Sequence, residues 1–83
     1  MKKHTKIYLE AMGYDTTDWI PCEVCQRQAV DIHHIEARGM GGSKNADTIE
    51  NLMALCRSCH ETLGDKTKFK ESLREIHLQR LLR

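Results

Sequence analysis

Two pairs of cysteines are the residues whose type and spacing most directly imply chemistry in this chain of 83 residues. Cys22 and Cys25 form one Cys-x-x-Cys pair, Cys56 and Cys59 form another, and thirty residues separate the two pairs. Each pair places two thiolates on one tight turn, and two such turns facing each other supply four sulfur ligands in a tetrahedron. Structural zinc prefers this arrangement, in which no coordination position stays open. We therefore predict a four-cysteine structural zinc site.

Three other chemistries use cysteines in similar patterns. Thiol redox proteins carry a lone Cys-x-x-Cys beside a βαβ unit, whereas this chain has two pairs and no βαβ pattern. Residues 56–60 (Cys-Arg-Ser-Cys-His) match the attachment pattern of c-type haem, but a haem there leaves the first cysteine pair unexplained and normally requires an exported chain. An iron–sulfur cluster also uses four thiolates. The two-turn spacing resembles zinc ribbons more closely, and iron stays the alternative.

The expected compartment also favours metal binding by these cysteines. Met1 is followed by Lys2-Lys3-His4-Thr5, and no apolar run is long enough for a secretory signal or a membrane span. We therefore expect an unexported, cytoplasmic protein, in which paired cysteines bind metal rather than form disulfides. One Phe, one Trp and two Tyr are few large residues for a core. Structural zinc in small finger peptides contributes about 10–16 kcal/mol, which exceeds what so thin a core supplies.

Three of the five histidines lie close to the cysteine pairs in sequence and need an explanation once the cysteines are assigned to zinc. Asp31-Ile32-His33-His34-Ile35 places two of them side by side, and His60 directly follows the last cysteine. Because neighbouring strand residues point to opposite faces, His33 and His34 cannot have the same role. Neutral imidazole is a metal ligand and, when it is not coordinated, a general base near neutral pH. If one of the two rings faces a metal ion, its neighbour faces elsewhere unless the strand bends.

A short series of elements is expected to position these residues. An amphipathic helix is predicted over 2–12, and alternating apolar residues predict a strand over 28–35. The apolar stretch 52–55 predicts a second strand, and the loop between the strands includes 39–43 (Gly-Met-Gly-Gly-Ser), which we expect to be exposed and flexible. One helix is expected to begin at the second cysteine pair, and another to span about 67–82. The sequence therefore predicts a small α+β fold, with a two-stranded antiparallel hairpin and flanking helices stabilised by zinc.

These motifs, taken together, resemble a known family. Cys22-x-x-Cys25, then the run 31–35 (Asp-Ile-His-His-Ile), then the run 51–60 (Asn-Leu-Met-Ala-Leu-Cys-Arg-Ser-Cys-His) are similar to the pattern of HNH endonucleases. The resemblance is closest to the subgroup whose ββα-metal (His-Me) finger is braced by a four-cysteine zinc. It covers residues 22 to about 60, and it is specific because the cysteine turns, the double histidine, the asparagine and the last histidine occur in order.

The resemblance implies one HNH nuclease domain over 1–83. Its expected parts are an N-terminal helix at 1–13, a zinc-braced ββα core at 20–65 and a basic C-terminal helix at 66–83. A prokaryotic or phage protein is the expected source.

The resemblance also implies a role for each matching residue. His33 takes the position of a catalytic-metal ligand, where many family members have Asp, and His60 matches the second ligand. His34 matches the general base that activates water. Asn51 matches the middle residue, whose side chain ties down the loop between the strands and helps to orient the base. Two imidazole ligands favour first-row transition ions over magnesium, so Mn²⁺ is the first expectation, with Ni²⁺, Co²⁺ and Mg²⁺ as alternatives.

Four further residues have either two possible roles or no assigned role. Asp31 and Glu61 lie near the motif histidines in sequence, and either hydrogen bonds to those histidines or solvation explains them equally well. His4 and His77 fall on the predicted terminal helices, away from the motif, and the sequence assigns them no function.

The net charge of +1 is unevenly distributed and bears on the substrate. Residues 1–9 carry +3, residues 10–65 carry −6 and residues 66–83 carry +4. Basic ends suit a polyanion, although charge alone slightly favours two solvated helices. Contacts to the DNA backbone position a duplex without reading bases, so low sequence specificity is expected. The candidate contacts are Arg57, Lys66, Lys68, Lys70 and Arg74.

Together, these expectations predict that the protein is a metal-dependent DNA endonuclease that hydrolyses phosphodiester bonds. Because one active site cuts one strand per encounter, a monomer or weak dimer is expected to nick double-stranded DNA. The alternative is a non-catalytic zinc-finger module that binds nucleic acid or protein. That alternative accounts for the cysteines and the basic ends, but it leaves the three motif histidines without a role.

Overall fold

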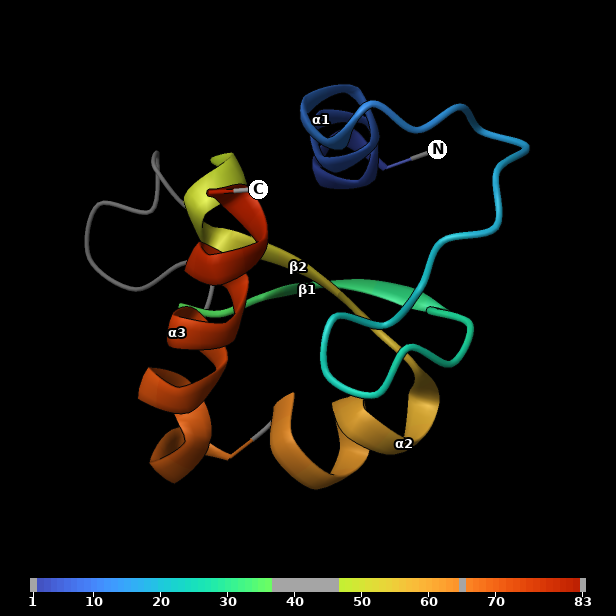
Figure 1. Ribbon diagram of the computed structural model, residues 1–83. Helices are drawn as coiled ribbons and strands as arrows, with labels where there is room; N and C mark the ends of the chain where they lie inside the picture. Colours follow the sequence, from blue (N-terminus) through green and yellow to red (C-terminus); the bar gives the residue numbers. More distant parts are fainter. Residues whose placement is uncertain (1, 37–46, 65, 83) are drawn as a thin grey trace.

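The structure is a computed structural model that describes residues 2–36, 47–64 and 66–82. Within these ranges, the expected α+β fold with an antiparallel hairpin and flanking helices is confirmed (Figure 1). The loop expected at 39–43 lies outside the described residues. The elements follow in the order α1 (Lys3–Met12), β1 (Asp31–His34), the 3₁₀ turn η2 (Ile49–Asn51), β2 (Leu52–Leu55), α2 (Arg57–Cys59), the π-helical turn η3 (His60–Gly64), the 3₁₀ turn η4 (Thr67–Phe69) and α3 (Lys70–Leu81).

The register of the hairpin decides which strand residues share a face. β1 and β2 pair antiparallel, with His33 opposite Met53 and Ile32 opposite Ala54. Directly opposed residues of an antiparallel pair project to the same side of the sheet, and successive residues alternate. His33 and Met53 therefore lie on one face, whereas Ile32 and His34 lie on the other.

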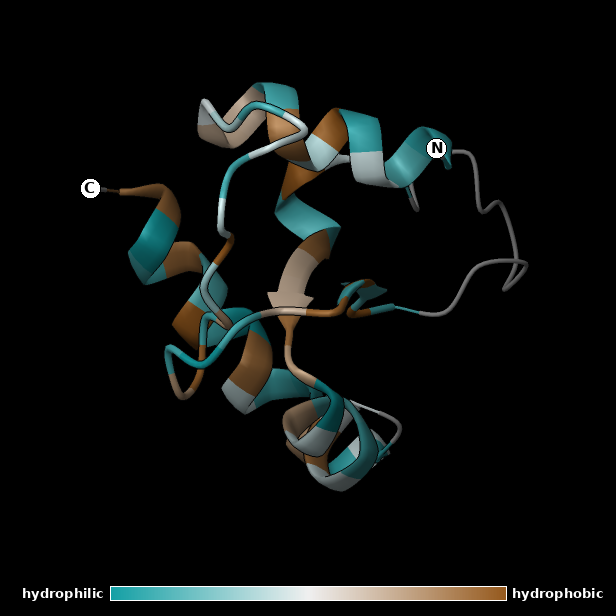
Figure 2. Cartoon of the chain, turned by 90° about the vertical axis from the view of Figure 1, so that its right-hand side faces the viewer, coloured by the Kyte–Doolittle hydropathy of each residue, from teal (hydrophilic) through white to brown (hydrophobic). Residues whose placement is uncertain are grey.

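Helices cover both faces of the hairpin, with α1 on one side and α2 on the other (Figure 1). All four residues of β2 are buried between these layers, and Figure 2 shows β2 as a hydrophobic stretch between α1 and α2. The core under α1 consists of Tyr8, Ile32, Leu52 and Ala54. The core under α2 and α3 consists of Cys22, Ile35, Met53, Leu55, Cys56, Cys59 and Leu73.

Both terminal helices form where the sequence predicts them. α1 ends at Gly13, which adopts a left-handed φ of 78° and donates its N–H to the carbonyl of Glu10. Glycine takes this conformation without the steric cost of a Cβ. At the other end, η4 leads into α3, in which Leu73 is buried and Leu78 is exposed; Leu82, which follows α3, is exposed as well. In the described part of the chain, no helix has the length and apolar character needed to cross a membrane.

The first strand is shorter than the predicted range 28–35. The N–H of Val30 still donates to the carbonyl of Leu55 at 3.0 Å, but Gln28 and Ala29 pair instead with the segment that leads into the first cysteine turn. The N–H of Ala29 donates to the carbonyl of Ile20 at 2.8 Å, and Pro21 bridges Gln28. This pairing ends the regular hairpin at Asp31 and fixes the first cysteine turn beside β1.

Candidate metal centre and active site

The four cysteines meet at one point although they come from two distant segments. Their sulfur atoms all lie within 4.8 Å of one another, and the Sγ atoms of Cys25 and Cys56 are 3.5 Å apart. All four are free thiols. Sulfurs around a tetrahedral zinc, at about 2.3 Å from the ion, are roughly 3.8 Å apart, so little movement is needed. The four cysteines are positioned to bind a metal ion, and an all-sulfur donor set suits zinc.

Backbone hydrogen bonds hold the first cysteine turn closed and polarise the second. Gln26 donates its N–H to the carbonyl of Cys22 at 3.0 Å and takes a left-handed φ of 67°. In the second turn, the Sγ of Cys56 accepts the backbone N–H of Cys59 at 3.4 Å. That N–H lowers the pKa of the Cys56 thiol to about 7, whereas burial raises the pKa of Cys59. Cys56 is therefore more readily deprotonated than Cys59, and thiolate is the form that binds metal.

A buried hydrogen-bond network ties the first cysteine turn to three other elements. One carboxylate oxygen of Glu23 accepts the hydroxyl of Tyr8 and the N–H of Ala54. The other oxygen lies 2.8 Å from Nδ1 of His77, whose Nε2 contacts the carbonyl of Ile49. Because both nitrogens of His77 face acceptors, the pair behaves as a buried imidazolium and carboxylate.

The same network corrects the expectation that His77 lies away from the motif. Its side chain is 0% exposed and bonds directly to a residue between two zinc ligands. Burial lowers the pKa of His77, but the hydrogen bonds to Glu23 and to the carbonyl of Ile49 outweigh this, so the pKa is raised overall. The role of His77 in this site is to fix the position of the cysteine turn.

His33 and His60 meet on the face of the hairpin that α2 covers. Their ring centroids are 5.0 Å apart with the planes nearly perpendicular, at 84°. Nε2 of His60 also lies 3.6 Å from a carboxylate oxygen of Asp31, which shares a strand face with His33. A Cβ at Gly64 would lie 3.3 Å from the ring of His33, so glycine lets η3 close over the two histidines. His60 thus lies beside both His33 and Asp31, although these three residues do not bring one ligand atom each within 4.8 Å of one another. Glu61 is instead 3.9 Å from Arg57.

His34 has different neighbours on the opposite face. Its Nε2 is 2.7 Å from a carboxylate oxygen of Asp47, and its ring centroid is 4.5 Å from that of His4. The expectation that His4 lies away from the motif is therefore wrong, because α1 packs on the hairpin face that carries His34. Burial lowers the pKa of His4, and the neighbouring His34 lowers it further. One feature of the sequence pointed to this location: His4 lies four residues before Tyr8, and therefore on the same helix face as a residue expected to be apolar and packed.

Two of the clefts that reach the motif histidines have lysines in their walls. A cleft of about 380 Å³ is lined by Asp31, His33, His34 and His60 together with Lys2 and His4 of α1. A second cleft of about 210 Å³ is lined by His33, His34 and Ile35 together with Gly64, Lys66, Thr67, Lys70 and Leu73. The second cleft therefore presents two lysines and no carboxylate to an approaching anion, whereas Lys2 in the first cleft is balanced by Asp31.

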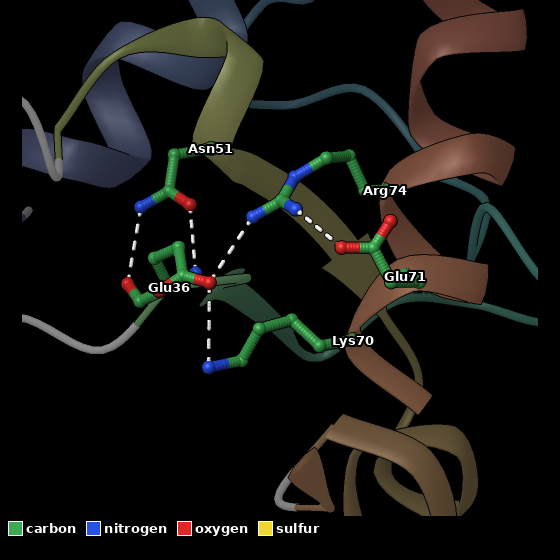
Figure 3. Close-up of polar contacts among 5 residues, drawn as sticks. All are labelled: Glu36, Asn51, Lys70, Glu71 and Arg74. Atoms are coloured by element: carbon green, nitrogen blue, oxygen red, sulfur yellow. Dashed lines mark hydrogen bonds and ion pairs between the residues drawn. The ribbon is translucent and has the colours of Figure 1, made fainter. Parts of the chain in front are cut away.

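Asn51 clamps the chain where it leaves β1 (Figure 3). Its side-chain oxygen accepts the N–H of Glu36 at 2.7 Å, and its side-chain nitrogen donates to the carbonyl of Glu36 at 3.1 Å. The carboxylate of Glu36 in turn lies 3.3 Å from Lys70 and 3.1 Å from Arg74, and Arg74 also bonds Glu71. The hydrogen bonds from Lys70 and Arg74 lower the pKa of Glu36. The clamp therefore connects the end of β1 to α3.

The five candidate DNA contacts lie in different surroundings. Lys66 and Lys70 line a cleft with His33, and Lys70 is also paired with a glutamate, as is Arg74. Arg57 is exposed beside Glu61, and the amine of Lys68 lies 5.1 Å from the ring centroid of Phe69. Arg57 also lines a cleft, with Asp31 and His60, so Arg57, Lys66 and Lys70 are the three of the five that share a cleft with a motif histidine.

Comparison with known proteins concerns this same region. The family model of HNH endonucleases matches residues 22–66, just over half of the chain, from the first cysteine to beyond η3. The chain belongs to the HNH endonuclease family. The match includes the four cysteines, the three motif histidines and the asparagine, whereas α1 and α3 lie outside it. No curated protein and no solved structure gives a significant match. HNH endonucleases are metal-using nucleases that act on DNA, and the cysteine cluster agrees with the zinc-braced subgroup.

Proposed function

We propose that this HNH protein is a metal-dependent endonuclease that hydrolyses phosphodiester bonds of DNA. The observation that carries the proposal is the separation of the two neighbouring histidines. The ring of His33 lies 5.0 Å from that of His60 on one face of the hairpin, while His34 bonds Asp47 on the other. A ligand pair and an uncoordinated imidazole next to it are the parts that metal-assisted hydrolysis requires.

The donor types on the first face suit a divalent transition ion. His33 and His60 would hold it, and a carboxylate oxygen of Asp31 lies 3.6 Å from Nε2 of His60. Imidazole nitrogens suit Mn²⁺, Ni²⁺ or Co²⁺ better than Mg²⁺. When bound, such an ion supplies charge stabilisation for the phosphate and for the departing 3′ oxygen.

His34 is proposed as the general base, with Asp47 as the residue that positions it. An ionised carboxylate accepts hydrogen bonds and donates none, so the 2.7 Å contact favours the tautomer of His34 that carries its proton on Nε2. That tautomer leaves the lone pair of Nδ1 available to take a proton from water. The imidazolium formed in this step would then face the carboxylate of Asp47, which stabilises it.

DNA is proposed to lie along the clefts that expose the histidines. Lys2 lines one cleft, and Lys66 and Lys70 line the other, so phosphates of a duplex can be bound on both sides of the motif. Lysine contacts to phosphate position the backbone without reading bases, which implies low sequence specificity and strong dependence on salt. A monomer or weak dimer with one such site per chain would nick the duplex.

Cleavage of supercoiled plasmid in Mn²⁺ tests the proposal. Wild-type protein is expected to produce nicked circles before linear DNA, and His34→Ala is expected to lower the rate at least about a hundredfold. Gln28→Ala, at an exposed position, is the control. Equal rates for wild type and His34→Ala would refute the assignment of the base. Binding of DNA without cleavage by the wild type would favour the non-catalytic zinc-finger alternative.

A further inference from the structure

Three metal-binding side chains converge on the hairpin face opposite His33. His4 comes from α1, His34 from β1 and Asp47 from the segment before η2. One ligand atom from each lies within 4.8 Å of the other two, and the closest pair, Nε2 of His34 and Oδ1 of Asp47, is 2.7 Å apart. Ligand atoms at about 2.1 Å from a tetrahedral ion are roughly 3.4 Å apart, so the donors are nearly in position.

The surroundings of this trio are those of a binding site. His4 is 7% exposed, and the side chains of His34 and Asp47 are 13% and 16% exposed. The cleft of about 380 Å³ that both histidines line connects them to solvent, which provides an entry path. Asp31 and Lys2 also line this cleft. With Asp47 included, two carboxylates stand near one ammonium group, a balance that favours a cation.

Packing alone does not explain why an imidazole of α1 lies against another imidazole. An apolar side chain at position 4 would cover the same core, whereas His4 places a second imidazole ring 4.5 Å from that of His34. A shared cation accounts for this pairing, because neutral imidazoles donate their lone pairs to it.

We propose that His4, His34 and Asp47 form a second site for a divalent transition ion of the zinc class, and that an ion bound there inhibits the nuclease. Two imidazoles and one carboxylate form a donor set that prefers such ions to Mg²⁺. The site is distinct from that of His33 and His60, because alternation along β1 places His33 and His34 on opposite faces. The inhibitory part rests on the proposed function, since a coordinated His34 can no longer act as the base.

Zinc stoichiometry tests the site without any assay of activity. The double variant His33→Ala/His60→Ala removes the proposed catalytic ligands, and after dialysis against zinc it is expected to hold one zinc ion beyond that of the cysteines. Adding His4→Phe, which keeps a ring on α1 but no donor, is expected to remove that ion, whereas adding Thr5→Ala is expected to leave it. Adding His4→Asn is a second test in case the larger ring disturbs α1, and retention of the cysteine-bound zinc reports folding. Absence of the second zinc from the double variant would overturn the proposal.

Inhibition by zinc tests the consequence for catalysis. With Mn²⁺ held constant, added zinc is expected to inhibit the wild type, and the zinc concentration that halves the rate is expected to rise at least about tenfold in His4→Phe. Each rate is compared with the zinc-free rate of the same variant, so zinc that displaces Mn²⁺ from His33 and His60 affects both proteins alike. Binding of the second zinc without inhibition of cleavage would leave the site standing and would refute His34 as the base.

Discussion

Glu23 offers the sharpest test of how the cysteine turn is held in place. Glu23→Ala removes the acceptor of Tyr8, Ala54 and His77 at once, at a point where the side chains of Glu23 and His77 are 2% and 0% exposed. Removal of one partner from a buried ion pair typically costs about 3–5 kcal/mol. In a domain of this size each kcal/mol lowers Tm by about 4–8 °C, so Tm should fall by more than about 10 °C.

Glu23→Gln should be far milder, because an amide can satisfy the same partners. The amide oxygen accepts from Tyr8 and Ala54, and the amide nitrogen donates to Nδ1 of a neutral His77. Nε2 of His77 then still donates its proton to the carbonyl of Ile49. With no orphaned polar group, we expect a cost below about 1.5 kcal/mol near neutral pH.

The two proteins should differ in the sign of their pH dependence. In the wild type the pKa of His77 is raised above the ordinary 6.5, so its contribution to stability is complete below pH 6.5 and is lost as pH rises through the folded-state pKa. In Glu23→Gln a neutral His77 is required, which places the folded-state pKa below 6.5. Its contribution is then present above pH 6.5 and is lost as pH falls.

Urea unfolding followed by circular dichroism, at fixed free zinc and between about pH 5.5 and pH 8.5, measures this difference. The difference in unfolding free energy between wild type and Glu23→Gln should grow as pH falls. Zinc binding by the cysteines depends on pH in the same way in both proteins, so it does not contribute to this difference. Glu10→Gln, on the exposed side of α1, is the control and should follow the wild type. A Glu23→Gln protein with the wild-type pH dependence would show that His77 and Glu23 are not an ion pair.

Three further changes have defined outcomes. Gly64→Ala places a Cβ 3.3 Å from the ring of His33, so the ring must shift by a few tenths of an ångström. The affinity for Mn²⁺, measured by electron paramagnetic resonance, should fall about tenfold. Unchanged affinity would contradict a catalytic ion bound by His33. Glu36→Gln removes the carboxylate that pairs with Lys70 and Arg74, so both cations become available to phosphate. Fluorescence anisotropy with duplex DNA should show tighter binding and a steeper salt dependence. Unaltered binding would mean that these cations do not contact phosphate. Gln26→Gly removes the steric strain of a left-handed φ of 67°. The free energy of unfolding should rise by about 1 kcal/mol and Tm by several degrees. A lower Tm would mean that the Gln26 side chain stabilises the turn.

Local patterns in the sequence were sufficient to predict the cluster of four cysteines and the hairpin. Ligand spacing within each cysteine pair is a property of a single turn, and the two turns can satisfy one ion only by meeting. Alternation along β1 likewise separates His33 from His34 whatever the rest of the fold does. The family was predictable for the same reason, because its motif lies within these local elements.

Contacts that depend on helix packing were not predictable. The sequence gives no direct indication that α1 lies on the face of His34, so His4 was placed away from the motif, and Asp47 gained its place only from the fold. Glu23 stands between two cysteines in a turn, where a charged side chain is ordinarily solvated. Its burial follows from the packing of α1 and α3 around the turn, which brings Tyr8 and His77 to it.

Anomalous diffraction from crystals of zinc-loaded protein soaked in Mn²⁺ tests most directly whether sulfur and imidazole hold two different ions. Data collected at the zinc and manganese absorption edges distinguish the two elements at each position. A zinc peak among the four cysteines and a manganese peak between His33 and His60 are the expected result. Manganese absent from the space between those two histidines, with zinc alone in the cysteine cluster, would contradict a catalytic ion at that position.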